Sequence, residues 1–327
     1  MSSKAKVLVT GCAGFIGYHL SKELLNNKSY EVYGLDNLND YYDVDLKKDR
    51  LKDLKKNKKF NFFKIDIAHK DKIIKNFKTN KYNYIIHLAA QAGVRYSITN
   101  PQAYVDSNLL GFCNVIEGAN IIKVKHFIFA STSSVYGASK KFPLKEFYNT
   151  DSPLSFYAAT KKSNEVISHA YANIFKLPIT GLRFFTVYGP YGRPDMALFK
   201  FTESIIKNKK IQLFNKGNHY RDFTYVDDIV SGIIGVIKKK PANKNVPFSI
   251  FNIGSNNPHY LKNFLSIIEK FLGNKAKVVY KGLQKGDVHK THADISSLNK
   301  KTKYYPKTSL KKGIYNFIEW YKSYYLN

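Results

Sequence analysis

The chain has 327 residues, of which 44% are hydrophobic and 24% are charged, a balance that excludes wholesale disorder. No stretch approaches the roughly 18 uninterrupted apolar residues of a membrane-crossing helix, and Met1 to Lys4 show no apolar signal core, which predicts a cytoplasmic protein without a membrane segment. The net charge of +29 suggests nucleic-acid binding, but 48 of the 53 basic residues are lysines spread along the chain. We therefore favour a solvated lysine-rich surface, with a basic nucleic-acid-binding protein as the alternative.

Short β-branched runs alternate with helical patterns through the first half of the chain. Strands are expected at 6–10, 31–36, 60–66, 84–88, 126–130 and 178–184. Helices are expected at 18–27, 101–120 and 155–175. After about residue 185 the pattern loosens, with strands at 211–214 and 249–253 and helices at 226–239 and 261–272.

This alternation predicts an α/β fold with a doubly wound parallel sheet. We expect a first domain over residues 1–182 and a smaller mixed α/β region over 183–327. Some segments of the second part, about 221–253, are expected to return to the first domain. Nothing resembling a flexible linker separates the two parts, so they should share one body.

A glycine-rich turn follows the first expected strand and precedes a helical pattern. Gly11, Gly14 and Gly17 have the spacing that lets backbone amides approach a pyrophosphate at a helix N-terminus. Asp36 ends the second expected strand, where a carboxylate accepts hydrogen bonds from the hydroxyls of an adenosine ribose and repels a 2′-phosphate. The pattern therefore predicts NAD rather than NADP. Cys12 in this turn and Cys113 are the only cysteines, and no metal site is expected.

Tyr157 and Lys161 are four residues apart at the start of an expected helix, so both side chains lie on one face. A nearby ammonium and a cationic nicotinamide ring both favour the phenolate, so we expect the pKa of Tyr157 to fall toward neutral pH. Thr132 follows the fifth strand and offers a hydroxyl to the substrate. Tyr157, Lys161 and Thr132 are the predicted catalytic residues.

These motifs resemble those of the extended short-chain dehydrogenases/reductases. More narrowly they resemble the NAD-dependent nucleotide-sugar epimerases, and most closely the UDP-glucuronate 4-epimerases. The resemblance covers nearly the whole chain and is carried by residues 7–17, 34–37, 39–43, 87–96 (HLAAQAGVRY), 131–137, 155–161, 182–196 (LRFFTVYGPYGRPDM), 221–228 (RDFTYVDD) and 286–288. It implies a Rossmann-type NAD-binding domain followed by a region that is mainly for the nucleotide sugar.

The resemblance also implies individual contacts. The implied NAD-binding residues are Gly11, Gly14, Phe15, Ile16, Gly17, Asp36, Asn37, Asp66, Ile67, Leu88, Ala89, Ala90, Gln91, Asn108, Tyr157 and Lys161. The implied substrate-binding residues are Arg95, Thr132, Ser133, Thr186, Arg193, Gln212, Phe214, Arg221 and Asp287. Arg221 is expected at the UDP diphosphate and Asp287 at the uridine ribose. Lys285 departs from the proline that relatives often carry before the last of these segments.

The reaction implied by the resemblance begins with Tyr157 taking a proton from the sugar O4 while NAD oxidises C4 to a ketone. Related dehydratases and decarboxylases carry an acidic residue shortly after the hydroxyl, but here the run is Thr132-Ser133-Ser134. This favours simple 4-epimerisation, interconverting UDP-glucuronate and UDP-galacturonate for polysaccharide synthesis. UDP-N-acetylglucosamine or UDP-glucose remain alternative substrates.

A uronate carboxylate favours a bidentate arginine partner, so Arg193 is the first candidate to bind it and Arg95 the second. The alternative for Arg193 is that it only holds its own loop or contacts phosphate. The helices at 101–120 and 155–175 carry apolar stripes, and in the resembling family these helices pair across an interface. We therefore expect a homodimer, unless the stripes only face the sheet.

Overall fold

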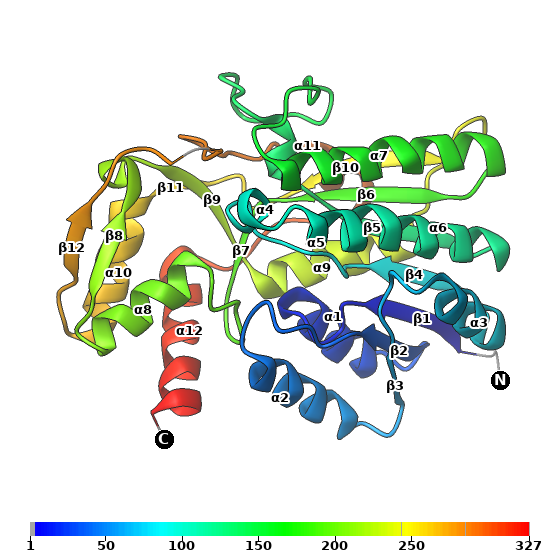
Figure 1. The fold of residues 1–327 in the computed structure, drawn as a ribbon, viewed down its shortest axis with the longest axis horizontal. Coiled ribbons are helices and arrows are strands. Elements are labelled where there is room, and N and C mark those ends of the chain that lie inside the picture. The colour runs from blue at the N-terminus through cyan, green and yellow to red at the C-terminus, as the bar shows by residue number, and fades with distance from the viewer. Residues whose placement is uncertain (1–3, 243, 285, 327) are drawn as a thin grey trace.

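The computed structural model describes residues 4–242, 244–284 and 286–326, so Met1 to Ser3 and Lys285, which entered the sequence expectations, lie outside the described residues. Seven parallel strands form the main sheet in the order β10-β6-β5-β4-β1-β2-β3 (Figure 1). They are β1 (Ala5–Thr10), β2 (Tyr30–Asp36), β3 (Phe60–Lys64), β4 (Tyr84–His87), β5 (His126–Thr132), β6 (Ile179–Phe184) and β10 (Phe248–Ile253). The predicted doubly wound parallel sheet is confirmed.

Helices cover both faces of this sheet, as the ribbon shows (Figure 1). One face packs against α1 (Phe15–Asn26), α2 (Val44–Lys55), α9 (Val226–Ile237) and α11 (Ser296–Thr302). The other face packs against α3 (Lys70–Asn80), α6 (Gly111–Ile121) and α7 (Phe156–Phe175). The strand order reverses between β1 and β4, and ligands of such sheets bind at the carboxyl ends of the strands beside that reversal.

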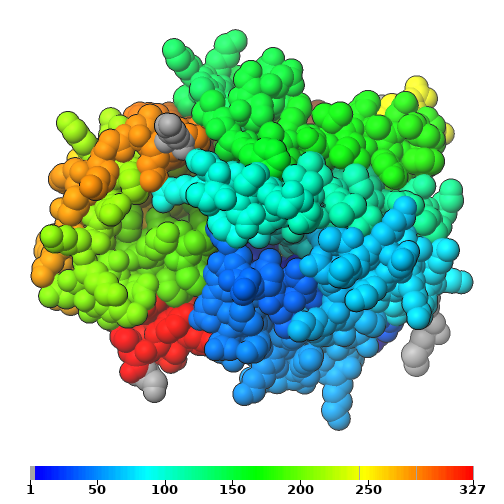
Figure 2. Space-filling model, in the orientation of Figure 1, coloured from blue at the N-terminus to red at the C-terminus, as the bar shows by residue number. Residues whose placement is uncertain are grey.

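A smaller region lies beside those carboxyl ends. It contains a three-stranded sheet and a two-stranded sheet around a third apolar core. Its strands are β7 (Thr186–Tyr188), β8 (Lys210–Leu213), β9 (Tyr220–Tyr225), β11 (Pro258–Tyr260) and β12 (Lys277–Tyr280). Its helices are α8 (Ala197–Ile206), η3 (Phe214–Gly217), α10 (Leu261–Leu272) and α12 (Leu310–Tyr325). The two regions lie against each other, the blue N-terminal segments touching the yellow-green lobe (Figure 2).

The helix expected over residues 101–120 is not a regular α-helix. After α4 (Tyr96–Thr99), the chain forms α5 (Gln102–Tyr104), then a π-helical segment η1 (Val105–Leu110), and only then α6. The wider turn holds Asn108, whose carbonyl accepts a hydrogen bond from Asn164 of α7 at 2.6 Å. Contacts with other elements therefore decide the backbone here, and π-helical turns of this kind are frequent at functional sites.

Several element boundaries also differ from expectation, and two of them lie at the carboxyl edge of the sheet. Helix α1 begins at Phe15 rather than at residue 18, so most of the glycine-rich turn lies at or inside the helix start. Strand β5 continues to Thr132, two residues further than expected, because residues 131 and 132 still pair with β6. Within the described part of the chain, no helix combines the length and the apolar character needed to cross a membrane.

Candidate active site

A cleft with a volume of about 1070 Å³ separates the carboxyl edge of the main sheet from the smaller region. Both regions line it, which brings together side chains from opposite ends of the sequence. The predicted site residues that line it are Gly11, Gly14, Phe15, Ile16, Gly17, Asp36, Asn37, Ile67, Leu88, Ala89, Ala90, Gln91, Arg95, Thr132, Ser133, Tyr157, Lys161, Thr186, Arg193, Gln212, Phe214, Arg221 and Asp287. Asp66 and Asn108 are not among the lining residues.

The turn between β1 and α1 forms one wall of the cleft and requires glycine for two different reasons. Gly11 has a φ of +72°, and a Cβ there would lie 2.8 Å from the amide nitrogen of Ala89. A Cβ on Gly17 would lie 2.0 Å from the carbonyl oxygen of Gly11. The backbone is thus packed too closely for side chains, and it leaves the first N–H groups of α1 facing the cleft for an anionic group.

Asp36 lies at the carboxyl end of β2, next to this turn. Its Oδ2 accepts a hydrogen bond from the amide of Ala13 at 3.0 Å, and its Oδ1 accepts one from the amide of Leu38 at 2.9 Å. Burial raises the pKa of Asp36, although both amides favour its charged form. Asn37 follows and donates to Asp66 at 2.9 Å. This edge of the sheet can hold the ribose of a dinucleotide. Asp66 does not line the cleft and would act indirectly, by accepting a hydrogen bond from the Asn37 side chain.

Asn108 also acts from behind the cleft wall. Its Oδ1 accepts from the amide of Gln91 at 2.8 Å, and its Nδ2 donates to the carbonyl of Gln91 at 3.0 Å. The same Nδ2 reaches Thr160 Oγ1 on α7 at 3.1 Å. The buried amide therefore fixes the backbone of the lining segment 88–91 to the helix that carries the predicted catalytic pair.

Tyr157, Lys161 and Thr132 meet in the cleft as predicted. Ser155 caps α7 by accepting from the amide of Ala158 at 3.1 Å, so Tyr157 enters the cleft in the first turn of the helix. Lys161 lies one turn further and donates to the carbonyl of Ala130 at 2.9 Å. This places the two side chains on one helix face beside the end of β5.

The expected fall in the pKa of Tyr157 is not what the polypeptide alone produces. Burial raises the pKa of Tyr157, while a hydrogen bond with Thr132 and the charge of Arg193 oppose the rise. Lys161 does not figure among these causes, and burial lowers its own pKa to about 8. The expectation included a bound nicotinamide ring and stays a prediction; in the polypeptide itself, removal of the phenol from water outweighs the neighbouring charges.

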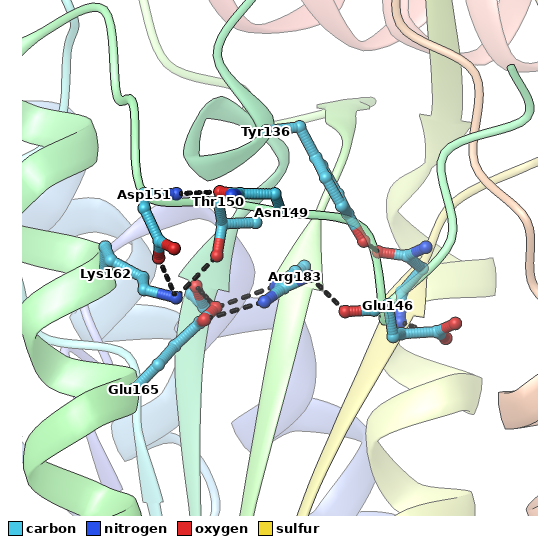
Figure 3. Close-up of polar contacts among 10 residues, drawn as sticks. Tyr136, Glu146, Asn149, Thr150, Asp151, Lys162, Glu165 and Arg183 are labelled. Atoms are coloured by element: carbon cyan, nitrogen blue, oxygen red, sulfur yellow. Dashed lines mark hydrogen bonds and ion pairs between the residues drawn. The ribbon is translucent and has the colours of Figure 1, made fainter. Parts of the chain in front are cut away.

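A buried ion pair joins the three elements that hold this site (Figure 3). Arg183 on β6 donates through Nε and Nη2 to the two oxygens of Glu165 on α7, each at 2.8 Å. Ser131, directly before Thr132 on β5, donates to Glu165 at 2.6 Å. Arg183 also donates to the carbonyl of Glu146 at 3.0 Å. The pair therefore sets the distance between α7 and the end of β5.

Arg193 reaches the cleft from the loop after β7. Its Nε donates to Asp195 Oδ1 at 2.9 Å, and its Nη2 contacts Asp195 Oδ2, so the fork is already bound within the loop. Tyr41 donates to the same carboxylate at 3.2 Å from the opposite side of the cleft. Arg193 itself lines the cleft. The Arg193–Asp195 pair therefore holds the loop in place, while the guanidinium of Arg193 places a positive charge at the cleft wall.

The other end of the cleft gathers the remaining predicted substrate residues. The guanidinium of Arg95 lies 4.9 Å from the ring centre of Phe214, which follows β8 and Gln212. Arg221 on β9 donates to Asp287 at 2.7 Å. A flat ring beside cationic and carboxylate groups suits a nucleotide, with the arginines toward phosphate and the carboxylate toward ribose hydroxyls.

Comparison with known proteins agrees with this geometry. The model of the "NAD dependent epimerase/dehydratase family" matches residues 7–254, more than half of the chain. The chain belongs to this family. The matched segment begins in β1 and ends just after β10, so it includes the strands of the main sheet and most of the residues that line the cleft.

Relatives within the epimerase/dehydratase family align over nearly the whole chain. Protein CapI of Staphylococcus aureus is 46% identical, with 98% of this chain and 99% of the relative covered. UDP-glucuronate 4-epimerase 2 of Arabidopsis thaliana is 44% identical, with 98% and 76% covered. The crystal structure of UDP-glucuronic acid 4-epimerase from Bacillus cereus, in complex with UDP-glucuronic acid and NAD, is 35% identical with a TM-score of 0.91, and 98% and 100% of the chains are covered.

Several cleft residues of this epimerase/dehydratase chain were missed by the sequence analysis. They are Tyr41, Lys47, Asp195, His219 and Gln284. Tyr41 and Asp195 lie within segments 39–43 and 182–196, which carry the family resemblance, so a signal was present but no role was assigned. Lys47 and His219 had no distinguishing sequence signal, because a single lysine or histidine becomes informative only when its neighbours in space are known.

Proposed function

We propose that this chain is a UDP-glucuronate 4-epimerase that interconverts UDP-glucuronate and UDP-galacturonate. The observation that carries the proposal is a cleft of the family architecture that combines Tyr157, Lys161 and Thr132 with a cation at Arg193. Support comes from full-length relatives named for this activity and from the neighbour crystallised with UDP-glucuronic acid and NAD. UDP-galacturonate made in this way would supply polysaccharide synthesis, and since both NAD and nucleotide sugars are cytoplasmic, we infer the same location for the protein.

The residues of the first wall fit NAD. The glycines keep side chains out of the tightly packed turn beside the cleft, and Asp36 lines the cleft at the end of β2. When bound, NAD supplies the chemistry of accepting a hydride from the sugar C4 and returning it. We assign NAD binding mainly to residues 1–182 and nucleotide-sugar binding mainly to residues 183–327. The segment at about 221–253 is assigned partly to each region.

The chain's own residues would manage the proton and the sugar ring. Tyr157 would remove the proton from O4 when C4 is oxidised and return it when C4 is reduced. Thr132 would hydrogen-bond the same region of the sugar, and Lys161 would hold the cofactor ribose and favour the charged phenol. Turning the ketone within the cleft before reduction inverts the configuration at C4.

The carboxylates that line the cleft in the described residues are all engaged by other groups of the protein. Asp36 is bound by backbone amides, Asp195 by Arg193, and Asp287 by Arg221. Glu203 pairs with Lys207 at 2.6 Å on α8. Residue 134, which follows Thr132 by two, is serine. Without a free base for C5, 4-epimerisation is favoured over dehydration or decarboxylation.

A substrate panel tests this assignment. Purified enzyme is given UDP-glucuronate, UDP-glucose and UDP-N-acetylglucosamine separately, and kcat/KM is measured for each. The proposal expects UDP-glucuronate to be preferred by at least about tenfold, as one charge-assisted contact would provide. A preference for either uncharged sugar would instead establish one of the alternative epimerases.

Arg193 is proposed to provide that charge-assisted contact from the wall of the cleft. Replacing Arg193 with alanine should weaken binding of UDP-glucuronate by about tenfold or more while leaving UDP binding within about twofold. Calorimetric titration of each ligand measures both effects, with Arg193→Lys as the control that keeps the charge. Equal losses for the two ligands would remove the carboxylate role and leave Arg193 as a residue that holds the loop through Asp195.

We also propose that the protein forms a homodimer through α6 and α7. Large apolar side chains on these helices are exposed, including Ile121, Val166, Ile174 and Phe175. An apolar face of this kind is costly to leave in water and suits a second copy of itself. Sedimentation should show a dimer for the wild type and a monomer for Val166→Asp. A wild-type monomer at micromolar concentration would contradict the proposal.

A further inference from the structure

His219 lies directly before β9 and is a buried histidine at the nucleotide end of the cleft. Its side chain is 3% exposed, yet the residue lines the cleft. It is placed between Arg221 and Asp287, the two residues proposed to receive the diphosphate and the uridine ribose. No role in proton transfer fits it, because the predicted catalytic tyrosine lies at the sugar end.

The contacts of His219 form a closed group of three side chains. Arg221 Nη2 donates to Asp287 Oδ1 at 2.7 Å and lies 3.3 Å from His219 Nδ1. His219 Nδ1 also lies 3.2 Å from the carbonyl oxygen of Val288. His219 Nε2 is buried without a hydrogen-bond partner in the described residues, 3.7 Å from Asp287 Oδ2. A proton on Nε2 would point at that second oxygen, whereas a bare Nε2 would set a lone pair against it.

The charges around His219 explain why protonation of its ring would depend on whether a ligand is bound. Arg221 faces the ring from its own strand, while Asp287 and His289 face it from the segment 286–292. Arg95 adds positive charge behind Arg221. Burial and Arg221 lower the pKa of His219, and Asp287 opposes them. A phosphate anion bound at Arg221 would offset the positive charge and favour the protonated ring.

We propose that His219 is a positioning residue that holds the Arg221–Asp287 pair for the nucleotide and makes nucleotide affinity depend on pH. The proposal rests on the proposed function, which places the diphosphate of the substrate at Arg221. Neutral His219 with its proton on Nδ1 donates to the carbonyl of Val288 and leaves Nε2 bare beside Asp287. Protonation adds a hydrogen on Nε2 that faces Asp287 Oδ2, so both carboxylate oxygens are held while the ligand's negative charge balances the extra proton.

The test measures binding of UDP, a nucleoside diphosphate without the sugar, by calorimetry at about pH 6 and about pH 8. Glutamine at position 219 keeps a hydrogen-bonding group but cannot titrate, and leucine keeps only volume. At the higher pH, His219→Gln should bind UDP within about twofold of the wild type, and His219→Leu about tenfold more weakly. At the lower pH the wild type should bind severalfold more tightly than His219→Gln, since a rise of one pKa unit on binding corresponds to tenfold in affinity at pH values below both pKa values and to less in between.

The comparison with His219→Gln at each pH cancels the titration of UDP itself. His69→Gln, at an exposed histidine before α3, is the matched control and should follow the wild type at both values. As a second measurement, the imidazole signals of the wild type followed by NMR should show the pKa of His219 rising when UDP is added. In turnover, the variants should change KM while kcat stays nearly constant.

Two results would contradict the inference about His219, and the experiments distinguish them. If wild type and His219→Gln keep the same affinity ratio at both pH values, and the NMR titration does not move with UDP, the inference about His219 is overturned while the epimerase assignment stands. If the wild type does not bind UDP at either pH, the placement of the nucleotide is wrong, and the proposed function fails together with the inference.

Discussion

Replacing Tyr157 with phenylalanine is expected to lower kcat for epimerisation by between about 10² and 10⁴, the range that a positioned acid or base contributes. The phenol is the one titratable group on the first turn of α7 that faces the cleft beside Thr132. Removing its oxygen leaves the ring in place, so the fold and the cofactor site should survive. Steady-state assays measure kcat, and the NAD content of the purified variant shows whether the cleft is intact.

Tyr171→Phe is the matched control, because Tyr171 lies on the same helix but outside the residues that line the cleft. It should leave kcat unchanged within about twofold, as expected for a surface substitution without a special role. A Tyr157→Phe enzyme that keeps NAD and full activity would show that the phenol is not the acid and base of the reaction.

Replacing Arg183 with methionine is expected to destabilise the protein by about 3–5 kcal/mol, because it leaves the carboxylate of Glu165 buried without its cation. Both side chains of the pair are only 5% exposed. Within the described part of the chain, the hydrogen bond from Ser131 at 2.6 Å is the one that would remain on this carboxylate. Urea unfolding at neutral pH measures the free-energy change, and the loss should be visible as a lower midpoint at an unchanged slope.

The double variant Arg183→Met with Glu165→Met separates the burial of charge from the loss of packing. It should be more stable than Arg183→Met alone, because no uncompensated charge remains. Since the pair sets α7 against the end of β5, the double variant should still lose part of its kcat. If Arg183→Met changed the unfolding free energy by less than about 0.5 kcal/mol, the pair would not hold these elements together.

The sequence predicted the order of strands and helices in the first half because each element has its own local period. It did not predict the π-helical segment around Asn108, whose shape follows from hydrogen bonds with Gln91 and Asn164 in other elements. The lowered pKa expected for Tyr157 depends on Lys161 and on a bound nicotinamide ring, whereas burial, which is a property of the whole fold, raises the pKa of the phenol in the polypeptide itself.

The same distinction between local sequence patterns and contacts of distant segments applies to the candidate site. Residues in recognisable segments, such as Gly11 and Lys161, were placed correctly in the cleft. Contacts between distant segments were not foreseen, as for Tyr41 and Asp195, which are separated by 154 positions and meet across the cleft. Arg193 was expected either to bind the uronate carboxylate or to hold its own loop, and the structure shows its guanidinium bound to Asp195, two residues away in that loop.

The most direct test of the proposed reaction follows isotopes during turnover in deuterated water. The enzyme is incubated with UDP-glucuronate and the sugar signals are followed by NMR. If Tyr157 moves only the O4 proton and no base acts at C5, UDP-galacturonate will accumulate with hydrogen retained at both C4 and C5 and without release of carbon dioxide. Deuterium at C5, or a pentose product, would contradict the account.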